Sequence, residues 1–214
     1  MPLDQATQII AIRHGETAWN RETRIQGHWD IPLNAVGQAQ AQRVAQALHG
    51  EAIAAIYSSD LSRARQTAEA IAAATGAPLQ LDVALRERAF GVFEGQTWSE
   101  IAQRWPVEAA RWRSRDLGFE AEGGGESLPT LFARSVGAVE RLASRHPGQT
   151  VVIVAHGGVL DCLYRASTRL ALDAARSWTL GNASINRLLY CGEGFSLIGW
   201  NDDFHLNHLT LDEV

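Results

Sequence analysis

The chain has only two cysteines, no long apolar stretch and no basic N-terminal leader. Cys162 and Cys191 stand in neither a metal-binding nor a redox spacing, which favours a reducing compartment such as the cytoplasm. No apolar run approaches the length of a membrane span. The first eight residues, MPLDQATQ, lack the basic start and the apolar core of a signal peptide. We therefore expect a cytoplasmic protein that does not bind a membrane.

An excess of positive charge is absent as well. The net charge is −5 and the pI is about 5.8, which disfavours nucleic acid or an anionic membrane as the main partner. A small anionic substrate is compatible with this charge, because a local cationic pocket can act against it. Apolar residues make up 46% of the 214 residues and charged residues 20%, as in a globular protein. We expect one domain over residues 1–214, and no pattern indicates an oligomeric state.

Short apolar runs that end in turn or polar residues predict six strands. Helical patterns lie between several of them, with apolar residues at helical spacing over 41–48, 64–71 and 128–142, and Asn34 and Ser127 are predicted N-caps. Strands that alternate with helices predict an α/β protein whose mostly parallel central sheet is covered on both faces. The predicted strands are Ile9–Ile12, Ala55–Tyr57, Leu79–Leu81, Val151–Ala155, Arg187–Cys191 and Leu197–Trp200.

The segment from about residue 96 to residue 125 breaks this alternation. It is rich in Trp and Arg and ends in EGGGE. We interpret it as a small helical cap inserted into the domain, and an ordinary peripheral helix pair is the alternative. Trp98, Trp105 and Trp112 recur every seven residues, which fits a packing stripe or, as a sharper hypothesis, a wall of the substrate pocket.

Two histidines each follow a predicted strand. Arg13 and His14 end the run IIAIRHG, and His156 and Gly157 follow the run VVIVA. The carboxyl ends of parallel strands are where open α/β sheets bind ligands. The glycines allow the backbone to come close to a ligand, and the helices that follow begin with free N–H groups. The two histidines therefore predict one shared anion site.

Two further strand ends add charged side chains to this site. Arg63 falls in the first turn of the helix that follows Ala55–Tyr57. Glu87 comes after the strand Leu79–Leu81, within LRERAFGVFEG, and Glu94 in the same stretch is the alternative to Glu87.

This set of side chains suits phosphoryl transfer. Arginine forks bind phosphate oxygens in pairs, and a neutral histidine nitrogen can attack phosphorus. A protonated Glu can protonate the leaving alkoxide and, once ionised, take a proton from the attacking water. Arg13, Arg63 and a cationic His156 would stabilise the charge on the transferring phosphoryl group without a metal or cofactor.

Four motifs in this order resemble the histidine phosphatase superfamily, also called phosphoglycerate mutase-like. They are RHGETAWN, SSDLSRARQTA, LRERAFGVFEG and AHGGVL, and the resemblance extends to EGGGES and GNASINRLLY. It implies a three-layer α/β/α sandwich. It also implies that His14 is the nucleophile that becomes phosphohistidine and that Glu87 is the proton donor. The implied phosphate pocket consists of Arg13, Arg63 and His156, and the residues implied to help hold the ligand are Asn20, Gln26, Gly27 and Gly157.

The superfamily divides by what accepts the phosphoryl group. Its mutases typically carry lysine and paired arginines after the Glu motif, and the region GQTWSEIAQRWPVEAARWRSRD has neither. This favours a phosphomonoesterase for a small phosphorylated metabolite, similar in length to broad-specificity bacterial phosphatases and to α-ribazole phosphatases. Arg111, Arg113 and Arg115 could partly replace the missing residues, so mutase activity is the alternative. An inactive phospho-ligand-binding scaffold is disfavoured, because the nucleophile and the acid are both present.

Two histidines near the C-terminus raise the question of a metal. His205 and His208 lie three residues apart, a spacing that can bind metal on a helix. No carboxylate pattern or cysteine accompanies them, so we expect a solvated tail and no metal site.

Overall fold

One six-stranded sheet forms the centre of the molecule. The computed structural model describes residues 5–207, and within them the strands follow the order β3-β2-β4-β1-β5-β6. All six predicted strands are confirmed, although β5 begins at Ile185 and not at Arg187. The strands are β1 (Thr7–Arg13), β2 (Ile53–Ser58), β3 (Leu79–Leu81), β4 (Thr150–Ala155), β5 (Ile185–Tyr190) and β6 (Phe195–Asp202).

The sheet is mostly parallel, as predicted, with an antiparallel edge. Strands β1 to β4 run parallel to their neighbours, whereas β5 and β6 are antiparallel. A tight turn joins β5 to β6, and its Gly192 and Gly194 have φ angles of 83° and 138°, which only glycine adopts readily. Because β1 and β4 are parallel neighbours, the segments that follow them leave the same edge of the sheet.

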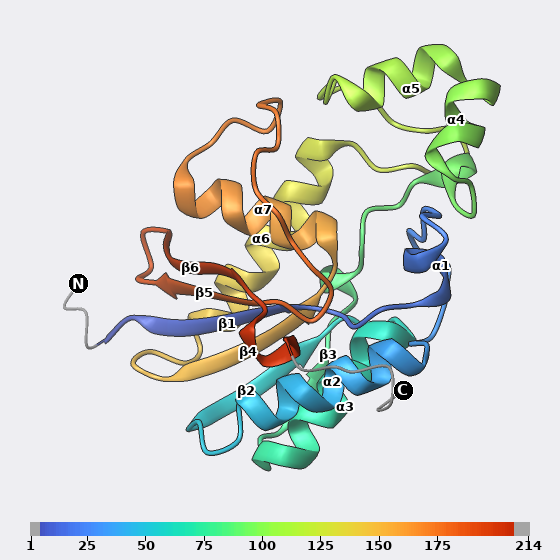
Figure 1. The fold of residues 1–214 in the computed structure, drawn as a ribbon. Helices are drawn as coiled ribbons and strands as arrows, with labels where there is room; N and C mark the ends of the chain where they lie inside the picture. The colour runs from blue at the N-terminus through green and yellow to red at the C-terminus, as the bar shows by residue number, and fades with distance from the viewer. Residues whose placement is uncertain (1–4, 208–214) are drawn as a thin grey trace.

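Helices cover both faces of the sheet and complete a three-layer α/β/α sandwich. Figure 1 shows α2 (Ala35–Ala47) and α3 (Ser62–Thr75) on one face, and α6 (Leu128–Ala143) and α7 (Gly157–Thr168) on the other. Successive residues of a strand point to opposite faces, so β1 contributes to both cores. Ile10 and Ile12 pack with α2 and α3, whereas Ile9 and Ala11 pack with α6 and α7. Each buried isoleucine stabilises the fold by roughly 2 kcal/mol.

The predicted helix starts are confirmed by their caps. The Asn34 side chain accepts a hydrogen bond from the Gly37 amide, and the Ser127 side chain accepts one from the Thr130 amide. Each bond satisfies an amide that the first helical turn leaves without a partner. Shorter elements are α1 (Ala18–Arg21), η2 (Val83–Leu85), η3 (Gly91–Phe93) and η4 (Phe204–Leu206).

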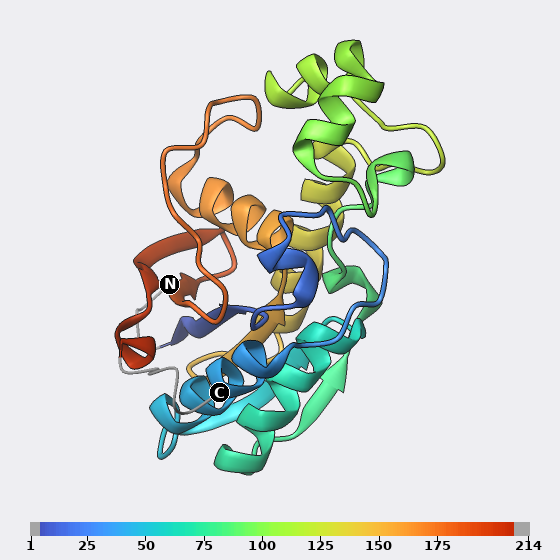
Figure 2. The same ribbon diagram turned by 45° about the vertical axis from the view of Figure 1, so that its right-hand side comes forward.

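The Trp- and Arg-rich segment forms two helices with their own small apolar cluster. They are α4 (Trp98–Arg104) and α5 (Pro106–Arg113), and both views show them standing apart from the sheet (Figures 1 and 2). Phe93, Ile101 and Phe119 are buried between them and the adjoining chain. The Trp105 ring packs 5.5 Å from that of Phe93, and the Trp98 and Trp112 rings lie 5.3 Å apart, so the packing stripe is confirmed.

Neither a membrane span nor a metal cluster occurs in residues 5–207. No helix there is long and apolar enough to cross a membrane, and no three His, Cys, Asp or Glu side chains gather as metal ligands would. His205 is half-buried, and its Nε2 lies 3.0 Å from the Ala183 carbonyl oxygen; it is therefore held against the body of the protein and is not a solvated tail residue. His208 lies outside the described residues.

Candidate active site

The two histidines of the sequence motifs meet because β1 and β4 are paired in register. Arg13 lies opposite Ala155 at the ends of these strands, and the His14 amide donates to the Ala155 carbonyl at 3.0 Å. His14 and His156 follow directly. Their ring centroids lie 5.1 Å apart, and both side chains are buried. The predicted convergence of the two strand ends is therefore present in the structure.

His14 has an unprotonated nitrogen available. Its Nδ1 lies 2.7 Å from the Gly15 carbonyl oxygen, and since a carbonyl can only accept, Nδ1 carries the proton and Nε2 has the lone pair. Burial lowers the pKa of His14 well below 6.5, and the positive charges of Arg63 and Arg13 lower it further. The imidazole is therefore neutral at neutral pH.

His156 has the opposite tautomer. Arg63 donates from Nε to His156 Nδ1 at 3.3 Å, so the proton of His156 lies on Nε2. This atom is buried and has no hydrogen-bond partner in the described part of the chain. Burial, followed by the charge of Arg63, lowers the pKa of His156 well below 6.5. In this environment the ring is a neutral donor, whereas a cationic His156 opposite a transferring phosphoryl group stays a prediction.

Arg63 is a fully buried guanidinium that holds the neighbouring loop. It is the second residue of α3, and its Nη1 and Nη2 donate to the carbonyls of Trp29 and Gly27, each at 2.8 Å. Burial lowers its pKa to about 10, so it remains charged at neutral pH. Gly27 has a φ of 51°, and a Cβ there would lie 2.0 Å from Glu94 Oε1, which explains the glycine.

Arg13 leaves one donor unused beside the start of α7. Its Nη1 donates to the Leu180 carbonyl at 2.7 Å, while its buried Nε has no partner in residues 5–207. A Cβ on Gly157 would lie 3.8 Å from Arg13 Nε and 3.7 Å from Glu87 Oε2. Gly157 therefore lies between a guanidinium and a carboxylate, with no side chain to separate them.

Glu87, not Glu94, lies next to the histidines. The Gly158 amide, in the first turn of α7, donates to the two Glu87 carboxylate oxygens at 3.0 and 3.1 Å, and the Arg88 amide donates to Oε1 at 2.8 Å. Glu94 instead accepts from the amides of His28 and Phe90. The Glu94 carboxylate therefore links the loop at His28 to the loop at Phe90.

Arg134 holds the turn that carries Glu87, and sequence reasoning missed this residue. From α6 its Nη1 donates to the Ala84 and Arg86 carbonyls at 2.8 and 2.9 Å. Its Nε and Nη2 make a paired contact with the Glu126 carboxylate at 2.8 and 2.7 Å. No local pattern could have identified Arg134, because its partners come from two distant segments.

Asn20 and Gln26 lie in the loop after His14 and are linked through Thr17. Asn20 Oδ1 accepts from the Thr17 amide at 3.1 Å, and Gln26 Oε1 accepts from the Thr17 hydroxyl at 2.9 Å. Asn182, which sequence reasoning missed, donates to the His14 carbonyl at 2.9 Å and to Asn20 Oδ1 at 3.3 Å. In the described structure the amide nitrogens of Asn20 and Gln26 make no hydrogen bond within the protein.

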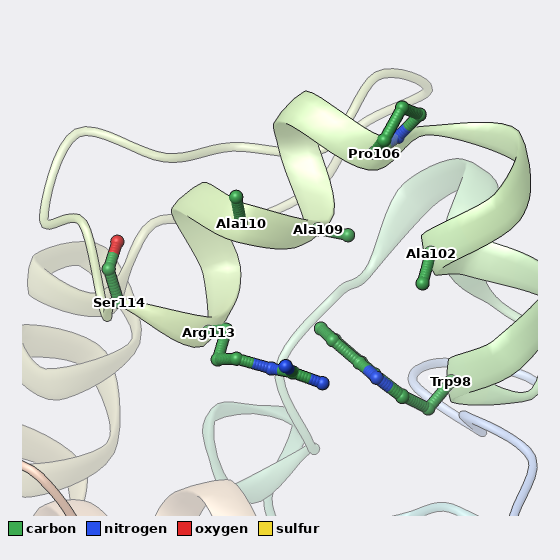
Figure 3. A pocket seen from close by; sticks show the side chains of 7 residues that line it. All are labelled: Trp98, Ala102, Pro106, Ala109, Ala110, Arg113 and Ser114. Atoms are coloured by element: carbon green, nitrogen blue, oxygen red, sulfur yellow. The ribbon is translucent and has the colours of Figure 1, made fainter.

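Several cavities lie near the helices of the cap segment, and two of them bear on the position of the site. The first, of about 240 Å³, is lined by Gly157 and Gly158 together with Trp112 and Phe90. The second, of about 350 Å³, lies between α4 and α5 (Figure 3), and no predicted site residue lines it. Of the three tryptophans in the stripe, Trp112 alone lines the cavity beside Gly157.

The fold and the site together define an α/β protein with groups that suit an oxyanion. An imidazole nitrogen with a free lone pair, an unused N–H on a second imidazole, two guanidinium groups and a carboxylate lie at the carboxyl end of a parallel sheet. Preorganised donors of this kind stabilise a charged transition state.

The comparison with known proteins names the family. The model of the histidine phosphatase superfamily (branch 1) matches residues 9–203, and the chain belongs to this superfamily. Phosphoglycerate mutase-like protein 4 of Arabidopsis thaliana is 40% identical over 93% of this chain and 86% of the relative. Metal-independent phosphoserine phosphatase of the same plant is 38% identical over 95% and 84%. The solved structure of Bacillus stearothermophilus YhfR is 35% identical, with a TM-score of 0.88 over 94% of this chain and all of that one.

The low pKa values of the two buried histidines predict a pH-dependent stability. Below about pH 6.5 His14 and His156 bind protons in the unfolded chain but stay unprotonated in the folded protein. The free energy of unfolding should therefore fall as the pH drops from about 6.5, by up to about 1.4 kcal/mol per pH unit for each histidine. Urea titrations between about pH 7 and pH 5 measure this slope.

A double variant and a control variant test whether the two buried histidines cause this pH dependence of the free energy of unfolding. The double variant His14→Gln and His156→Gln should lose most of it, whereas His49→Gln, at an exposed histidine after α2, should keep it. An unchanged slope in the double variant would show that the two imidazoles are not held neutral.

Proposed function

We propose that this protein is a phosphomonoesterase that hydrolyses a small phosphorylated metabolite through a phosphohistidine on His14. The observation that carries the proposal is the complementary protonation of two adjacent buried imidazoles. His14 presents a lone pair on Nε2, and His156 presents an unpartnered Nε2–H. One ring can attack phosphorus while the other donates to an oxygen of the same phosphoryl group.

The first half of the reaction forms the phosphoenzyme. His14 Nε2 attacks phosphorus, an N–P bond forms and the ester P–O bond breaks. Glu87, protonated in the substrate complex, gives its proton to the leaving alkoxide. Donors for the phosphoryl oxygens are the Nε of Arg13 and the Nε2 of His156, both without a protein partner in the described chain. Arg63 adds its positive charge, and each of its terminal nitrogens keeps a second hydrogen beyond the bonds to Gly27 and Trp29.

The second half releases inorganic phosphate. Water attacks phosphorus and gives its proton to the ionised Glu87 as the N–P bond breaks, which returns the lone pair to His14. No step in this sequence uses a metal or a cofactor. The carboxylate is suited to both halves because the Gly158 amide and the Arg88 amide fix it at the first turn of α7.

The contacts of the three alternating arginines of the cap favour hydrolysis over the mutase reaction. Arg111 contacts Asp116 at 2.6 Å, and Arg113 stacks on the Trp98 ring at 4.5 Å, so neither lines the cavity beside the site. Arg115 alone lines it. Mutase activity remains the second candidate, since one relative is named as phosphoglycerate mutase-like.

Two further features belong to the proposal. We place the protein in the cytoplasm, since it has only two cysteines and both are free thiols. We also assign residues 1–214 to one domain, with residues 96–125 as a cap whose Trp112 faces the leaving group.

His14→Ala should abolish phosphate release from p-nitrophenyl phosphate, with kcat lower by about 10,000-fold, because it removes the attacking nitrogen. Phosphate release and an unfolding curve are measured together, and His49→Ala serves as the control.

Wild-type protein should trap an acid-labile phosphoryl group on His14 and should keep its full activity in EDTA. Normal turnover by the alanine variant would refute the nucleophile.

Gly158→Ala tests Glu87 as the acid. The new Cβ would lie 2.3 Å from Glu87 Oε1, so the carboxylate must move, and kcat for an alkyl phosphate should fall by about 100-fold. For p-nitrophenyl phosphate, whose leaving group needs little protonation, the loss should be much smaller. Gly137→Ala in α6, where nothing lies within 4 Å of the new Cβ, should leave both rates intact. Equal losses for the two substrates would contradict the acid role.

Incubation with 3-phosphoglycerate and a 2,3-bisphosphoglycerate primer separates the two candidate activities. We expect inorganic phosphate to appear and little 2-phosphoglycerate to form, because a single arginine of the cap reaches the cavity. Product analysis by ³¹P NMR follows both species at once. Rapid isomerisation with little free phosphate would make the protein a mutase.

A further inference from the structure

A cluster of charged side chains adjoins the cavity beside Gly157 and Gly158, and the reaction described above does not use it. This cluster, here called the Asp161 cluster, consists of Arg115, Asp161, Arg165 and Arg176. Its members come from the chain after α5, from α7 and from the loop after α7. Arg115, Asp161 and Arg176 line the same cavity as Gly157 and Gly158.

One carboxylate oxygen of this cluster lacks a partner although it is buried. Asp161 is 5% exposed, and its Oδ2 accepts from Arg115 Nη2 at 3.0 Å and from Arg165 Nε at 2.9 Å. Its Oδ1 accepts no hydrogen bond in the described structure, and Arg176 Nε is 3.9 Å away, beyond hydrogen-bond distance. A buried carboxylate oxygen without a donor is costly, so this atom is a candidate acceptor for a donor that a ligand brings.

The guanidinium groups around Asp161 also keep unused donors. Arg115 Nε is bound to the Leu172 carbonyl, but its Nη1 bonds to nothing within residues 5–207. Arg176 donates only from Nε, to the Trp178 carbonyl at 3.1 Å, and both of its terminal nitrogens are unused in the same range. Arg165 has a structural role, because it donates to the Ala171 carbonyl and stacks on the Trp178 ring at 4.8 Å. Arg165 Nη2 is also buried without a partner in residues 5–207, but Arg165 does not line the cavity. The unused donors on residues that line it therefore belong to Arg115 and Arg176.

The cavity lies on the leaving-group side of the reaction. Gly157 and Gly158 line it, and the Gly158 amide holds the Glu87 carboxylate that protonates the leaving oxygen. Burial is the main cause of the lowered pKa of Arg13, and the charge of Arg176 lowers it further, so these two guanidinium groups share one region. A group attached to an ester oxygen beside Glu87 therefore has room to extend toward Asp161.

We propose that the Asp161 cluster selects a leaving group that carries both a carboxylate and a neighbouring hydrogen-bond donor. Arg115 and Arg176 bind the carboxylate, and Asp161 Oδ1 accepts from an ammonium or hydroxyl group next to it. The substrate class is then the phosphate ester of a small hydroxy acid with an amino or hydroxyl substituent, a size that suits a cavity of about 240 Å³. This proposal rests on the phosphomonoesterase function.

Four esters of similar length test the two contacts separately. O-phospho-L-serine carries a carboxylate and an ammonium group, 3-phosphonooxypropanoate only the carboxylate, O-phosphoethanolamine only the ammonium group, and ethyl phosphate neither. The measured quantity is kcat/KM from phosphate release, compared as ratios on the same protein sample. Wild-type protein should use O-phospho-L-serine best, and removing either group should lower kcat/KM by about tenfold or more.

Two variants, one of Asp161 and one of Arg176, should each change a different ratio of kcat/KM values. Asp161→Asn should abolish the preference for O-phospho-L-serine over 3-phosphonooxypropanoate, and Arg176→Gln should abolish the preference for O-phospho-L-serine over O-phosphoethanolamine. Because each ratio compares two substrates on one variant, partial unfolding does not change it. Arg113→Ala is the matched control, since this cap arginine stacks on Trp98 outside the cavity, and it should keep both ratios.

The possible failures are distinguishable. If the esters are hydrolysed but the wild-type protein shows no preference, or both variants keep the wild-type ratios, the cluster only supports the loop after α7 and the inference is wrong, while the phosphomonoesterase remains. If neither the four esters nor p-nitrophenyl phosphate release phosphate, the proposed function fails and this inference fails with it.

Discussion

Two imidazoles that lie side by side against two guanidinium groups favour the neutral form of both rings. His14 and His156 are buried and surrounded by positive charge, so burial and the charges of Arg13 and Arg63 hold both pKa values well below 6.5. A neutral imidazole has one donor nitrogen and one acceptor nitrogen, and the partner of Nδ1 decides which of the two carries the proton. The Gly15 carbonyl gives His14 its free lone pair, and Arg63 gives His156 its free proton. The proposed division of labour follows from these two contacts.

The scaffold positions this pair through the sheet and then fixes the surroundings through backbone carbonyls. Parallel pairing of β1 and β4 sets the spacing of the two rings. Arg63 fastens the loop at Gly27 and Trp29, and Arg134 fastens the turn that ends at Glu87. Buried guanidinium groups suit this task because one side chain can satisfy several carbonyls at once. The chain contains no lysine at all, so every such contact is made by arginine.

Much of this arrangement could be predicted from the sequence, and the remainder could not, for physical reasons. Strand ends and helix starts are local signals, so His14, His156, Arg63 and Glu87 could be placed at one edge before any coordinates. The start of β5 was missed because Asn186 interrupts its apolar pattern; the side chain is buried and donates to the Ala11 carbonyl. The protonation of His156 could not be assigned from the sequence, because it depends on a guanidinium 93 positions away. Roles that depend on such distant contacts leave no pattern along the chain.

The convergence of these groups on one phosphoryl position is tested most directly by a crystal structure with vanadate, which adopts the five-coordinate geometry of the transferring phosphorus. We predict a vanadium atom bonded to His14 Nε2, with the Glu87 carboxyl group on the opposite side. Equatorial oxygens should accept hydrogen bonds from His156 Nε2 and Arg13 Nε, two buried donors of the site that have no partner within residues 5–207. Vanadate bonded to His14 Nδ1 or to another residue, or bound without contact to His156, would contradict the assignment.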